Sequence, residues 1–408
     1  MKRLFFIITY LLIAQATYSY TEAPGYTQHE VDADWLIVGA GPAGIAAIGI
    51  LLDIGVPPQR LTWIDPEFNV GRMGAYYDYV TSNNATHEFI AFINACHSFQ
   101  QCPAETVHKL NSLNPLAFDN LQVVIDPLRD ITAYLCTQIR AIQNSMESLY
   151  FTNDNWYITT CSGESVSAHH VILATGSHPK TIDYEQHKII SLDLALNPYN
   201  LERLVTSDDI VGVVGGSHSA IMLLKFLSEL PFPVKHIYNL YNSPLIYTID
   251  KGDYKINALD GLKGMTAQWA QEVLEKNPPA NLTRIQSSPE ALKATIELCS
   301  KIIYAIGFER NNLPEINDTT PITATEAGII APRLFGMGFA FPEKITTYEG
   351  KEGYRVGLRS FMDYAQRMIP VWYNADNNCL RGQSEIEHIQ KRLYRLLECA
   401  DIFTISLL

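Results

Sequence analysis

Three glycines near the amino end of the chain, Gly39, Gly41 and Gly44, follow the spacing Gly-x-Gly-x-x-Gly. A short apolar run at residues 35–38 precedes them and a run rich in Ala, Ile and Leu at residues 45–52 follows, so a strand, a turn and a helix are expected. In such a turn the first glycine allows a tight bend, the second lets the backbone approach phosphate groups, and the third lets helix and strand pack closely. The free N–H groups at the start of the helix favour a bound anion. The motif therefore predicts a pyrophosphate site.

A second apolar run at residues 61–64 ends in Asp65, at about the 20-residue spacing from the last glycine where a ribose-binding acid is expected. Together with the turn, which Pro42 and Ala43 complete, this run makes a βαβ unit that is expected to bind a dinucleotide. An Asp before Pro66 is also ordinary turn chemistry, which is the alternative role of Asp65.

A second unit of the same kind lies far downstream. Residues 210–214 and 234–240 are expected to be strands, with a helix at residues 221–230 between them. The turn after the first of these strands consists of Gly215, Gly216, Ser217, His218, Ser219 and Ala220. The residues at the three glycine positions of the motif are Gly, Ser and Ala, which are small enough for a ligand to approach the backbone. A second dinucleotide site is therefore expected.

No Asp, Glu or Arg stands near residues 238–241, where the second strand of this unit ends. An acid there would favour NAD and an arginine would favour the 2′-phosphate of NADP, so the missing acid favours NADP only slightly. Lys251, Lys255 and Lys263 could supply positive charge or could be surface lysines. His218 could donate a hydrogen bond to a phosphate or to the nicotinamide, or could point to solvent.

Two further strand-like runs mark where the chain leaves the first unit and returns to it. Residues 166–174 end in Ala-Thr-Gly, and residues 302–306 end in Gly307. The predicted fold class is α/β, with two Rossmann-like dinucleotide-binding domains of which the second is inserted into the first. The expected boundaries are 30–190 and 301–375 for the first domain, 191–300 for the second, and 376–408 for a C-terminal helical tail.

The chain has 408 residues and a formal net charge of −13. This charge argues against a nucleic-acid-binding surface, which needs a basic footprint. Lys2 and Arg3, the apolar run at residues 4–14 and a small-residue cleavage site after it fit a signal peptide. Residues 1–19 are therefore expected to be removed and the protein to be exported to the periplasm, the outside of the cell or the lumen of the endoplasmic reticulum. No other run is long and apolar enough to span a membrane.

Two dinucleotide units in this arrangement resemble the flavoproteins with two dinucleotide-binding domains. That superfamily includes glutathione and thioredoxin reductases, flavin-containing monooxygenases and N-hydroxylating monooxygenases. The resemblance implies that the first turn binds FAD and the second binds NADP or NAD. Ala174-Thr175-Gly176 and Ala305-Ile306-Gly307 look like the two crossover motifs of the superfamily. The further cofactor-binding residues that the resemblance implies are Arg72, Met73 and Gly338, the last through a backbone turn that could approach the flavin ring.

The cysteines separate the branches of this superfamily. A disulfide reductase needs a cysteine pair beside the flavin, and neither residues 71–77 nor residues 191–209 contain a cysteine. Cys96 and Cys102 are the most plausible local pair, so a thiol–disulfide oxidoreductase that works with a protein partner remains an alternative. The histidines show no metal-ligand spacing, so no metal site is predicted.

Residues 80–84, Val-Thr-Ser-Asn-Asn, are similar to the segment where flavin-containing monooxygenases place an Asn near the flavin. The similarity implies a catalytic role for Asn83, whose amide could hydrogen-bond to an oxygenated flavin or to the nicotinamide. An ordinary turn residue is the alternative. The protein is predicted to be an FAD-dependent oxidoreductase that uses NAD(P)H. Among the reactions of such enzymes, the oxygenation of a small molecule by a monooxygenase is favoured. An exported flavin reductase or oxidase and a non-catalytic flavin or nucleotide sensor are the alternatives.

Overall fold

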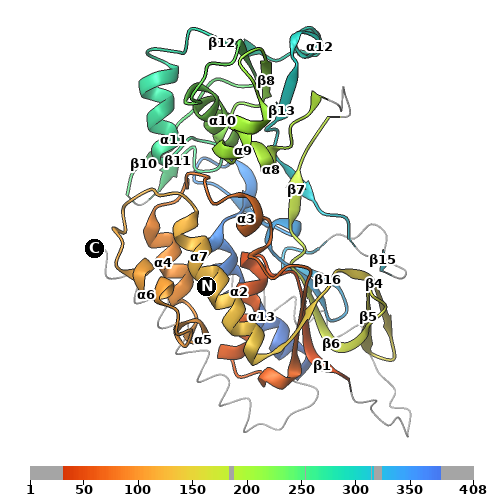
Figure 1. The fold of residues 1–408 in the computed structure, drawn as a ribbon. Helices are drawn as coiled ribbons and strands as arrows, with labels where there is room; N and C mark the ends of the chain where they lie inside the picture. Colours follow the sequence, from red (N-terminus) through yellow and green to blue (C-terminus); the bar gives the residue numbers. More distant parts are fainter. Residues whose placement is uncertain (1–30, 183–187, 253, 314, 317–323, 378–408) are drawn as a thin grey trace, which may run out of the picture. The chain divides into compact units, whose positions relative to one another are not determined.

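In a computed structural model of the chain, the described residues are 31–182, 188–252, 254–313, 315–316 and 324–377. The predicted signal peptide at residues 1–19 lies outside these ranges. So do residues 378–408, which are nearly all of the predicted C-terminal helical tail. Within these ranges the strands form a nine-stranded sheet, a four-stranded sheet and three two-stranded ribbons (Figure 1).

The large sheet has the strand order β15-β4-β5-β6-β1-β2-β3, with β17 beside β6 and β16 beside β17. Its strands are β1 (Ala33–Val38), β2 (Leu61–Asp65), β3 (Arg140–Gln143), β4 (Met146–Thr152), β5 (Asn155–Thr160), β6 (Ser165–Leu173), β15 (Glu315–Ile316), β16 (Ile329–Ala331) and β17 (Leu334–Gly336). β1 pairs in parallel with β2 and β6, and β2 with β3. The carboxyl ends of these strands therefore meet at one edge of the sheet, where ligands of open α/β sheets bind.

β1 is buried on both faces, as a parallel strand between two layers must be. Trp35 and Ile37 pack into a core formed with the helices, whereas Leu36 and Val38 pack into a core formed with β4, β5 and β6. Figure 1 shows helices α2, α7 and α13 on the same side of β1. The helices of this part are α2 (Pro42–Asp53), α3 (Gly71–Tyr76), α4 (Thr86–Asn94), α5 (His97–Gln100), α6 (Glu105–Asn111), α7 (Gln122–Gln138) and α13 (Leu358–Asn377).

The four-stranded sheet is fully parallel, in the order β12-β9-β8-β13. Its strands are β8 (Ile210–Val214), β9 (His236–Tyr241), β12 (Leu282–Gln286) and β13 (Lys301–Tyr304). Its helices are α8 (Leu192–Ala195), α9 (Pro198–Leu204), α10 (His218–Ser228), α11 (Gly264–Trp269), which continues into a π-helical turn (Ala270–Leu274), and α12 (Pro289–Leu298). α10 and α11 contribute to the core on one face of this sheet, and α12 packs on the other.

The chain leaves the large sheet after β6 and returns to it after β13. β7 (Ser177–Pro179) and β14 (Phe308–Arg310), which follow those two strands, pair with each other in antiparallel fashion. The other ribbons are β10 (Ile249–Asp250) with β11 (Lys255–Ile256), and β18 (Glu343–Thr346) with β19 (Glu352–Arg355). The predicted α/β class with parallel sheets is thereby confirmed. The helix of the second unit begins at His218, three residues earlier than expected, with Ser217 at its N-cap position.

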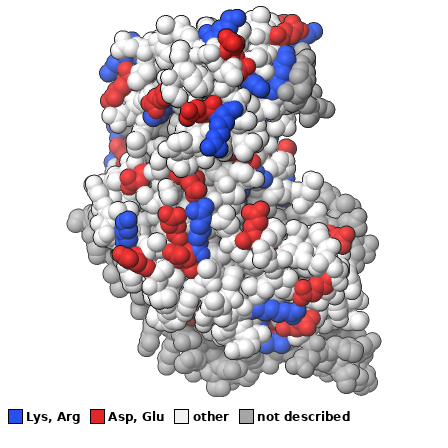
Figure 2. Space-filling model, viewed as in Figure 1, with Lys and Arg blue, Asp and Glu red and all other residues white. Residues whose placement is uncertain are grey.

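Charged side chains of both signs are interspersed on the face shown in Figure 2. Several charged side chains of the described residues form exposed ion pairs, such as Arg140 with Glu164 at 3.0 Å and Lys344 with Glu352 at 2.8 Å. Pairs of this kind contribute little to stability in water. Among the described helices, none combines the length and the apolar character needed to cross a bilayer.

Candidate functional site

The first glycine turn is packed so closely that two of its glycines have no room for a side chain. Gly39 has a φ of +105°, and a Cβ built there would lie 2.4 Å from the carbonyl oxygen of Ala174. A Cβ on Gly44 would lie 1.9 Å from the carbonyl oxygen of Gly39. Gly41 differs, because a Cβ there would meet no described atom within 4 Å. Gly41 thus faces open space at the start of α2, where the first backbone N–H groups of a helix lack intrahelical partners.

That open space belongs to a cavity of about 610 Å³. The cavity is lined from the carboxyl ends of β1, β2 and β6, from α3, and from residues 80–84 and 356–358. The predicted site residues that line it are Gly39, Gly41, Pro42, Asp65, Arg72, Met73, Asn83, Thr175, Gly176 and His218. The predicted residues outside its lining are Ala43, Gly44, Gly215, Gly216, Ser217, Ser219, Ala220, Gly307 and Gly338. The structure therefore gathers most of the residues predicted for the first cofactor around one cavity.

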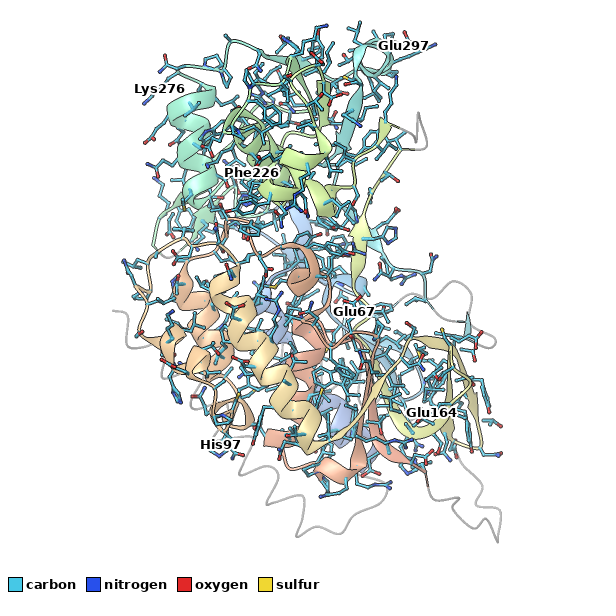
Figure 3. The ribbon with its side chains drawn as sticks, viewed as in Figure 1. Glu67, His97, Glu164, Phe226, Lys276 and Glu297 are labelled. Carbon is cyan, nitrogen blue, oxygen red and sulfur yellow. The ribbon has the colours of Figure 1, made fainter. Side chains whose placement is uncertain are left out.

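Asp65 uses its carboxylate to close the turn. Oδ2 accepts a hydrogen bond from the backbone N–H of Ala40 at 2.7 Å, and Oδ1 accepts from those of Glu67 and Phe68 at 2.9 and 2.7 Å. The side chain is buried, and three of the roughly four acceptor positions of a carboxylate are taken. Glu67, labelled in Figure 3, also lines the cavity and is exposed. Sequence spacing singled out Asp65, which keeps about one acceptor position, whereas the carboxylate of Glu67 has no described hydrogen-bond partner and keeps all of its acceptor positions for a ligand.

Arg72 lies beside the cavity with its charge already paired. Its Nε donates to the carbonyl oxygen of Ser177 at 2.8 Å, and its Nη1 donates to the carboxylate of Asp193 on α8. The hydroxyl of Tyr77 donates to the other oxygen of Asp193 at 2.8 Å. Burial and the neighbouring Asp193 carboxylate raise the pKa of Tyr77, so this hydroxyl remains a donor. Asp193 was not recognised from the sequence, because no local motif surrounds it.

The segment after β6 borders the cavity with an unsatisfied polar group. The Oγ1 atom of Thr175 is buried and has no hydrogen-bond partner in the described part of the chain. The carbonyl oxygen of Thr175 accepts a hydrogen bond from Asn311 Nδ2 at 2.7 Å, which fixes the segment in place. Because buried hydroxyls are normally hydrogen-bonded, Thr175 Oγ1 fits a site built for a polar ligand.

Asn83 stands in a turn at the cavity. The Oγ of Ser82 accepts a hydrogen bond from the backbone N–H of Asn84 at 2.9 Å, which closes the turn. The side chain of Asn83 is exposed, lines the cavity and makes no hydrogen bond to another described residue. Its amide is therefore available to a ligand, as the predicted role requires, while its backbone occupies the turn that the alternative role describes.

His218 connects the second glycine turn to the same segment. Its Nε2 lies 2.9 Å from the carbonyl oxygen of Thr81. A carbonyl only accepts hydrogen bonds, so Nε2 must carry the ring proton. Nδ1 is buried with no described partner, and burial lowers the pKa of His218, which keeps the ring neutral. From the sequence, His218 could donate to a ligand or point to solvent; in the structure its Nε2–H donates to Thr81 instead, because tertiary packing brings that carbonyl within reach.

The second glycine turn repeats the packing of the first. Gly215 has a φ of +140°, and a Cβ there would lie 2.2 Å from the carbonyl oxygen of Ala305. In the first unit Trp63 Nε1 donates to the carbonyl oxygen of Gly39 at 3.0 Å. At the equivalent position of β9, Asn239 Nδ2 donates to the carbonyl oxygen of Gly215 at 2.8 Å. Different side chains thus hold the two turns in the same way.

Tyr241 ends β9 at the position that Asp65 occupies at the end of β2. Arg284, from the neighbouring strand β12, lies over the Tyr241 ring with its Cζ 4.4 Å from the ring centroid. Its Nε donates to Asn239 Oδ1 at 3.0 Å, and its Nη2 is buried with no described partner. The sequence showed no arginine at the end of β9 itself. Only the pairing of β9 with β12 brings Arg284 to that place.

Two further predicted glycines shape the surroundings of the cavity without lining it. Gly338 has a φ of +78°, and a Cβ there would lie 2.6 Å from the Cβ of Ala43, so this turn lies against the start of α2. The next residue, Phe339, lines the cavity. Gly307 has a φ of +96° and lies where the chain turns from β13 into β14.

Cys96 and Cys102, the pair considered from the sequence, are free and buried in the structure. Burial raises the pKa of Cys96 well above its usual range, and a buried protonated thiol is a poor nucleophile. The described lining of the cavity contains no cysteine. In the described ranges no group of three or more His, Cys, Asp and Glu side chains could hold a metal ion.

Comparison with known proteins identifies a matching family and proteins with a similar sequence or fold. Residues 36–178 match the family model of FAD-NAD(P)-binding proteins. The chain is 30% identical over 388 residues to Monooxygenase AgnR1 of Paecilomyces divaricatus, an alignment that covers 83% of this chain and 98% of that protein. A flavin-containing monooxygenase from Stenotrophomonas maltophilia has a similar fold, with 14% identity, coverage of 85% and 98% of the two chains, and a TM-score of 0.55. So does the bacillithiol disulfide reductase Bdr (YpdA) from Staphylococcus aureus, with 12% identity, 82% and 95% coverage, and a TM-score of 0.54.

The chain therefore belongs to the FAD- and NAD(P)-binding flavoprotein oxidoreductases with two dinucleotide-binding domains. It is an FAD- and NAD(P)-dependent oxidoreductase, as the sequence predicted. The residues present fit FAD, because the glycine turn leaves open space at Gly41 and the buried hydroxyl of Thr175 lacks a described partner beside the cavity. The fold is shared by a monooxygenase and a disulfide reductase, so the reaction has to be argued from the site.

Proposed function

We propose that this oxidoreductase is a monooxygenase that uses NADPH to transfer one atom of dioxygen to a small molecule. The observation that carries the proposal is the absence of cysteine from the described cavity lining, because thiol–disulfide chemistry needs a thiol beside the flavin. The relative with 30% identity, which is named a monooxygenase, supports it. The hydride of NADPH and one solvent proton balance the reaction, in which one oxygen atom enters the substrate and the other leaves as water.

When bound, FAD supplies the two-electron chemistry, and the protein binds, orients and excludes water. The free N–H groups around Gly41 at the start of α2 would hold the pyrophosphate. Glu67 would bind the ribose hydroxyls, and the Oγ1 atom of Thr175 would donate to or accept from the cofactor. Asn83, which lines the cavity, would offer its amide as a neutral hydrogen-bonding group to the flavin or the substrate.

Water exclusion is the second task of the cavity walls. Tyr76, Val80, Phe308, Phe339 and Phe361 line the cavity with apolar surface. An apolar wall keeps water from the reacting centre and so suppresses the loss of electrons to side reactions.

NADPH rather than NADH is the proposed electron donor. The second turn would hold the pyrophosphate, and the end of β9 would hold the adenosine ribose. Arg284 supplies a positive charge over the Tyr241 ring, and residues 238–241 contain no carboxylate to repel a 2′-phosphate. Arginine suits this task because its planar guanidinium matches phosphate geometry.

The test is anaerobic mixing of the FAD-loaded protein with NADPH and, separately, with NADH, followed by flavin absorbance. The proposal expects rapid bleaching by NADPH and slower bleaching by NADH. Addition of isotopically labelled dioxygen and a panel of small molecules should then place labelled oxygen in one product, as read by mass spectrometry. Absence of bleaching by either donor contradicts the proposal, and so does complete conversion of the electrons to hydrogen peroxide with every compound of the panel.

Export is a separate proposal, supported by the charged start and the apolar run of residues 1–19. Expression of the full chain in its native host and sequencing of the mature amino terminus would test it. Cleavage near Ala16 or Ser19 is the expected result. A mature chain that retains residues 1–19 in the cytosol would contradict it.

A further inference from the structure

Exposed apolar side chains gather at one end of the cavity. Tyr76, Phe339 and Val356 are 39%, 43% and 43% exposed, and all three line the cavity. Phe339 is in ring contact with Phe308 and with Phe361, at centroid distances of 6.2 and 5.4 Å. We call the aromatic end the part of the cavity that is lined by Tyr76, Tyr77, residues 80–84, Phe308, Phe339, residues 356–358 and Phe361. Exposed large apolar side chains that converge on a cavity mark a place where an apolar ligand is bound.

The lining residues of the aromatic end include no Asp, Glu, Lys or Arg. Arg72, which lines the cavity next to it, has its Cζ 5.5 Å from the centroid of the Tyr76 ring. The carboxylates of Asp65 and Glu67 lie at the carboxyl end of β2, and the charge of Arg72 is paired with Asp193. His218 reaches this end in its neutral form, and its Nε2–H donates a hydrogen bond to the carbonyl oxygen of Thr81. A charged substrate would therefore lose its hydration without gaining a partner, which costs several kcal/mol for an unpaired ion.

Polar groups at this end are neutral amides. Asn83 lies at this end, and Asn312 also lines the cavity; both are exposed and form no hydrogen bond to a described side chain. Asn311 is already engaged, because its Nδ2 donates to Thr175 and its Oδ1 lies 3.0 Å from His178 Nδ1. An uncharged carbonyl or hydroxyl on a ligand would suit the two available amides, which both donate and accept.

We infer that the substrate is a neutral, predominantly apolar small molecule with an uncharged oxygen function, bound at the aromatic end. The inference deepens the proposed monooxygenase function and rests on it. It separates this chain from enzymes that oxidise charged amino acids or other ionic compounds, for which a site must provide a counter-charge.

Binding of three matched probes to the FAD-loaded, oxidised protein tests the inference without turnover. The probes are 2-naphthol, 2-naphthoate and 2-naphthylmethylamine at neutral pH, which share an aromatic body and are neutral, anionic and cationic. Perturbation of the flavin absorbance spectrum reports binding. The expected result is that 2-naphthol binds at least about tenfold more tightly than either charged probe. Equal or tighter binding of a charged probe overturns the inference.

A charge introduced at the aromatic end should change this order. Val356→Lys places an ammonium group where the side chain is 43% exposed, so the fold should tolerate it. The variant is expected to bind 2-naphthoate at least about fivefold more tightly than the wild type does. Val371→Lys on α13, where Val371 is 41% exposed and outside the cavity lining, is the matched control and should leave all three affinities unchanged. Equal gains in both variants would show a general charge effect and contradict the location.

The binding measurement and the oxygenation measurement fail separately. If the neutral probe is preferred and no labelled oxygen enters any product, the monooxygenase proposal is wrong while the ligand class stands. If labelled oxygen enters only charged compounds, the ligand class is wrong while the monooxygenase proposal stands. FAD content, measured from the ratio of flavin to protein absorbance, must be equal in the wild type and the variants before their binding or oxygenation results are compared.

Discussion

The two glycine turns share one packing scheme and differ in what they present to a ligand. Gly39 and Gly215 both lie close to a backbone carbonyl oxygen at the end of a neighbouring strand of their sheet. A Cβ built on Gly39 would be 2.4 Å from the oxygen of Ala174, and one built on Gly215 would be 2.2 Å from that of Ala305. Beyond that, the first turn opens on the cavity and its second strand ends in Asp65, whereas the second turn is followed by Tyr241 beneath Arg284. Backbone packing thus specifies a dinucleotide turn, and the side chains at the end of the second strand specify which dinucleotide it suits.

The largest expected effect separates packing glycines from ligand-facing glycines within the first turn. Gly44→Ala forces a Cβ to within 1.9 Å of the Gly39 carbonyl oxygen, so the turn must move. We expect a loss of about 3 kcal/mol in the free energy of unfolding, measured by denaturant titration with circular dichroism. Gly41→Ala meets no described atom, so its loss of stability should stay below about 1 kcal/mol while retention of FAD falls.

Equal destabilisation by the two substitutions would contradict this division of roles. Retention of FAD is read from the flavin absorbance that survives gel filtration. If Gly41→Ala keeps its flavin as well as the wild type does, Gly41 does not face the cofactor.

The same contrast shows what local sequence can and cannot predict. The turns, their strands and their helices follow from glycine spacing and apolar runs, because these elements form from contiguous residues. Arg284, Asp193 and Asn311 act on segments far away in the chain, through strand pairing or folding that no local pattern encodes. Asp65 was identified by spacing, but its oxygens are used by nearby backbone N–H groups, a detail of turn geometry that spacing does not contain.

The next largest effect is expected when the residue at the end of β9 is replaced by the one found at the end of β2. Tyr241→Asp places a carboxylate where the first unit has Asp65 and gives Arg284 a partner. We expect affinity for NADPH to fall at least about tenfold, because the carboxylate repels the 2′-phosphate, with affinity for NADH unchanged or higher. Isothermal titration calorimetry of the FAD-loaded protein with each nucleotide measures both.

Arg284→Ala is the complementary substitution, and Arg203→Ala, at an exposed residue in the last turn of α9, is its control. Loss of NADPH affinity in the Arg284 variant alone would support the assignment. Equal loss of NADH and NADPH affinity would instead assign Arg284 to holding the turn through Asn239.

A smaller, pH-dependent effect is expected at the residue that joins the second turn to residues 80–84. Burial holds the pKa of His218 in the folded protein below its ordinary value of 6.5. As pH falls, the unfolded chain therefore takes up a proton at this residue before the folded protein does. The stability contributed by neutral His218 is fully present above that ordinary value and is lost as pH falls through the folded-state pKa.

Unfolding free energies of the wild type and His218→Gln should accordingly differ by about 1 kcal/mol at about pH 8, and the difference should narrow towards about pH 5. His87→Gln, at an exposed histidine outside the two glycine turns, is the control for the substitution itself. A difference between wild type and His218→Gln that widens on acidification would mean that His218 is charged in the folded protein.

The smallest expected effect tests which carboxylate of the first unit meets the ligand. Glu67→Gln removes an exposed, cavity-lining charge that no described residue uses, so stability should be unchanged while FAD affinity falls about threefold. Fluorescence titration of the apoprotein with FAD measures the affinity, and Glu297→Gln on α12, away from the cavity, serves as the control. An unchanged FAD affinity would indicate that Asp65, and not Glu67, binds the ribose hydroxyls, through the one acceptor position that its hydrogen bonds to backbone N–H groups leave open. The two units would then differ only at the end of the second strand, where the first unit has the Asp65 carboxylate and the second has Tyr241 with Arg284 over its ring. Glu67 would have no role in binding FAD.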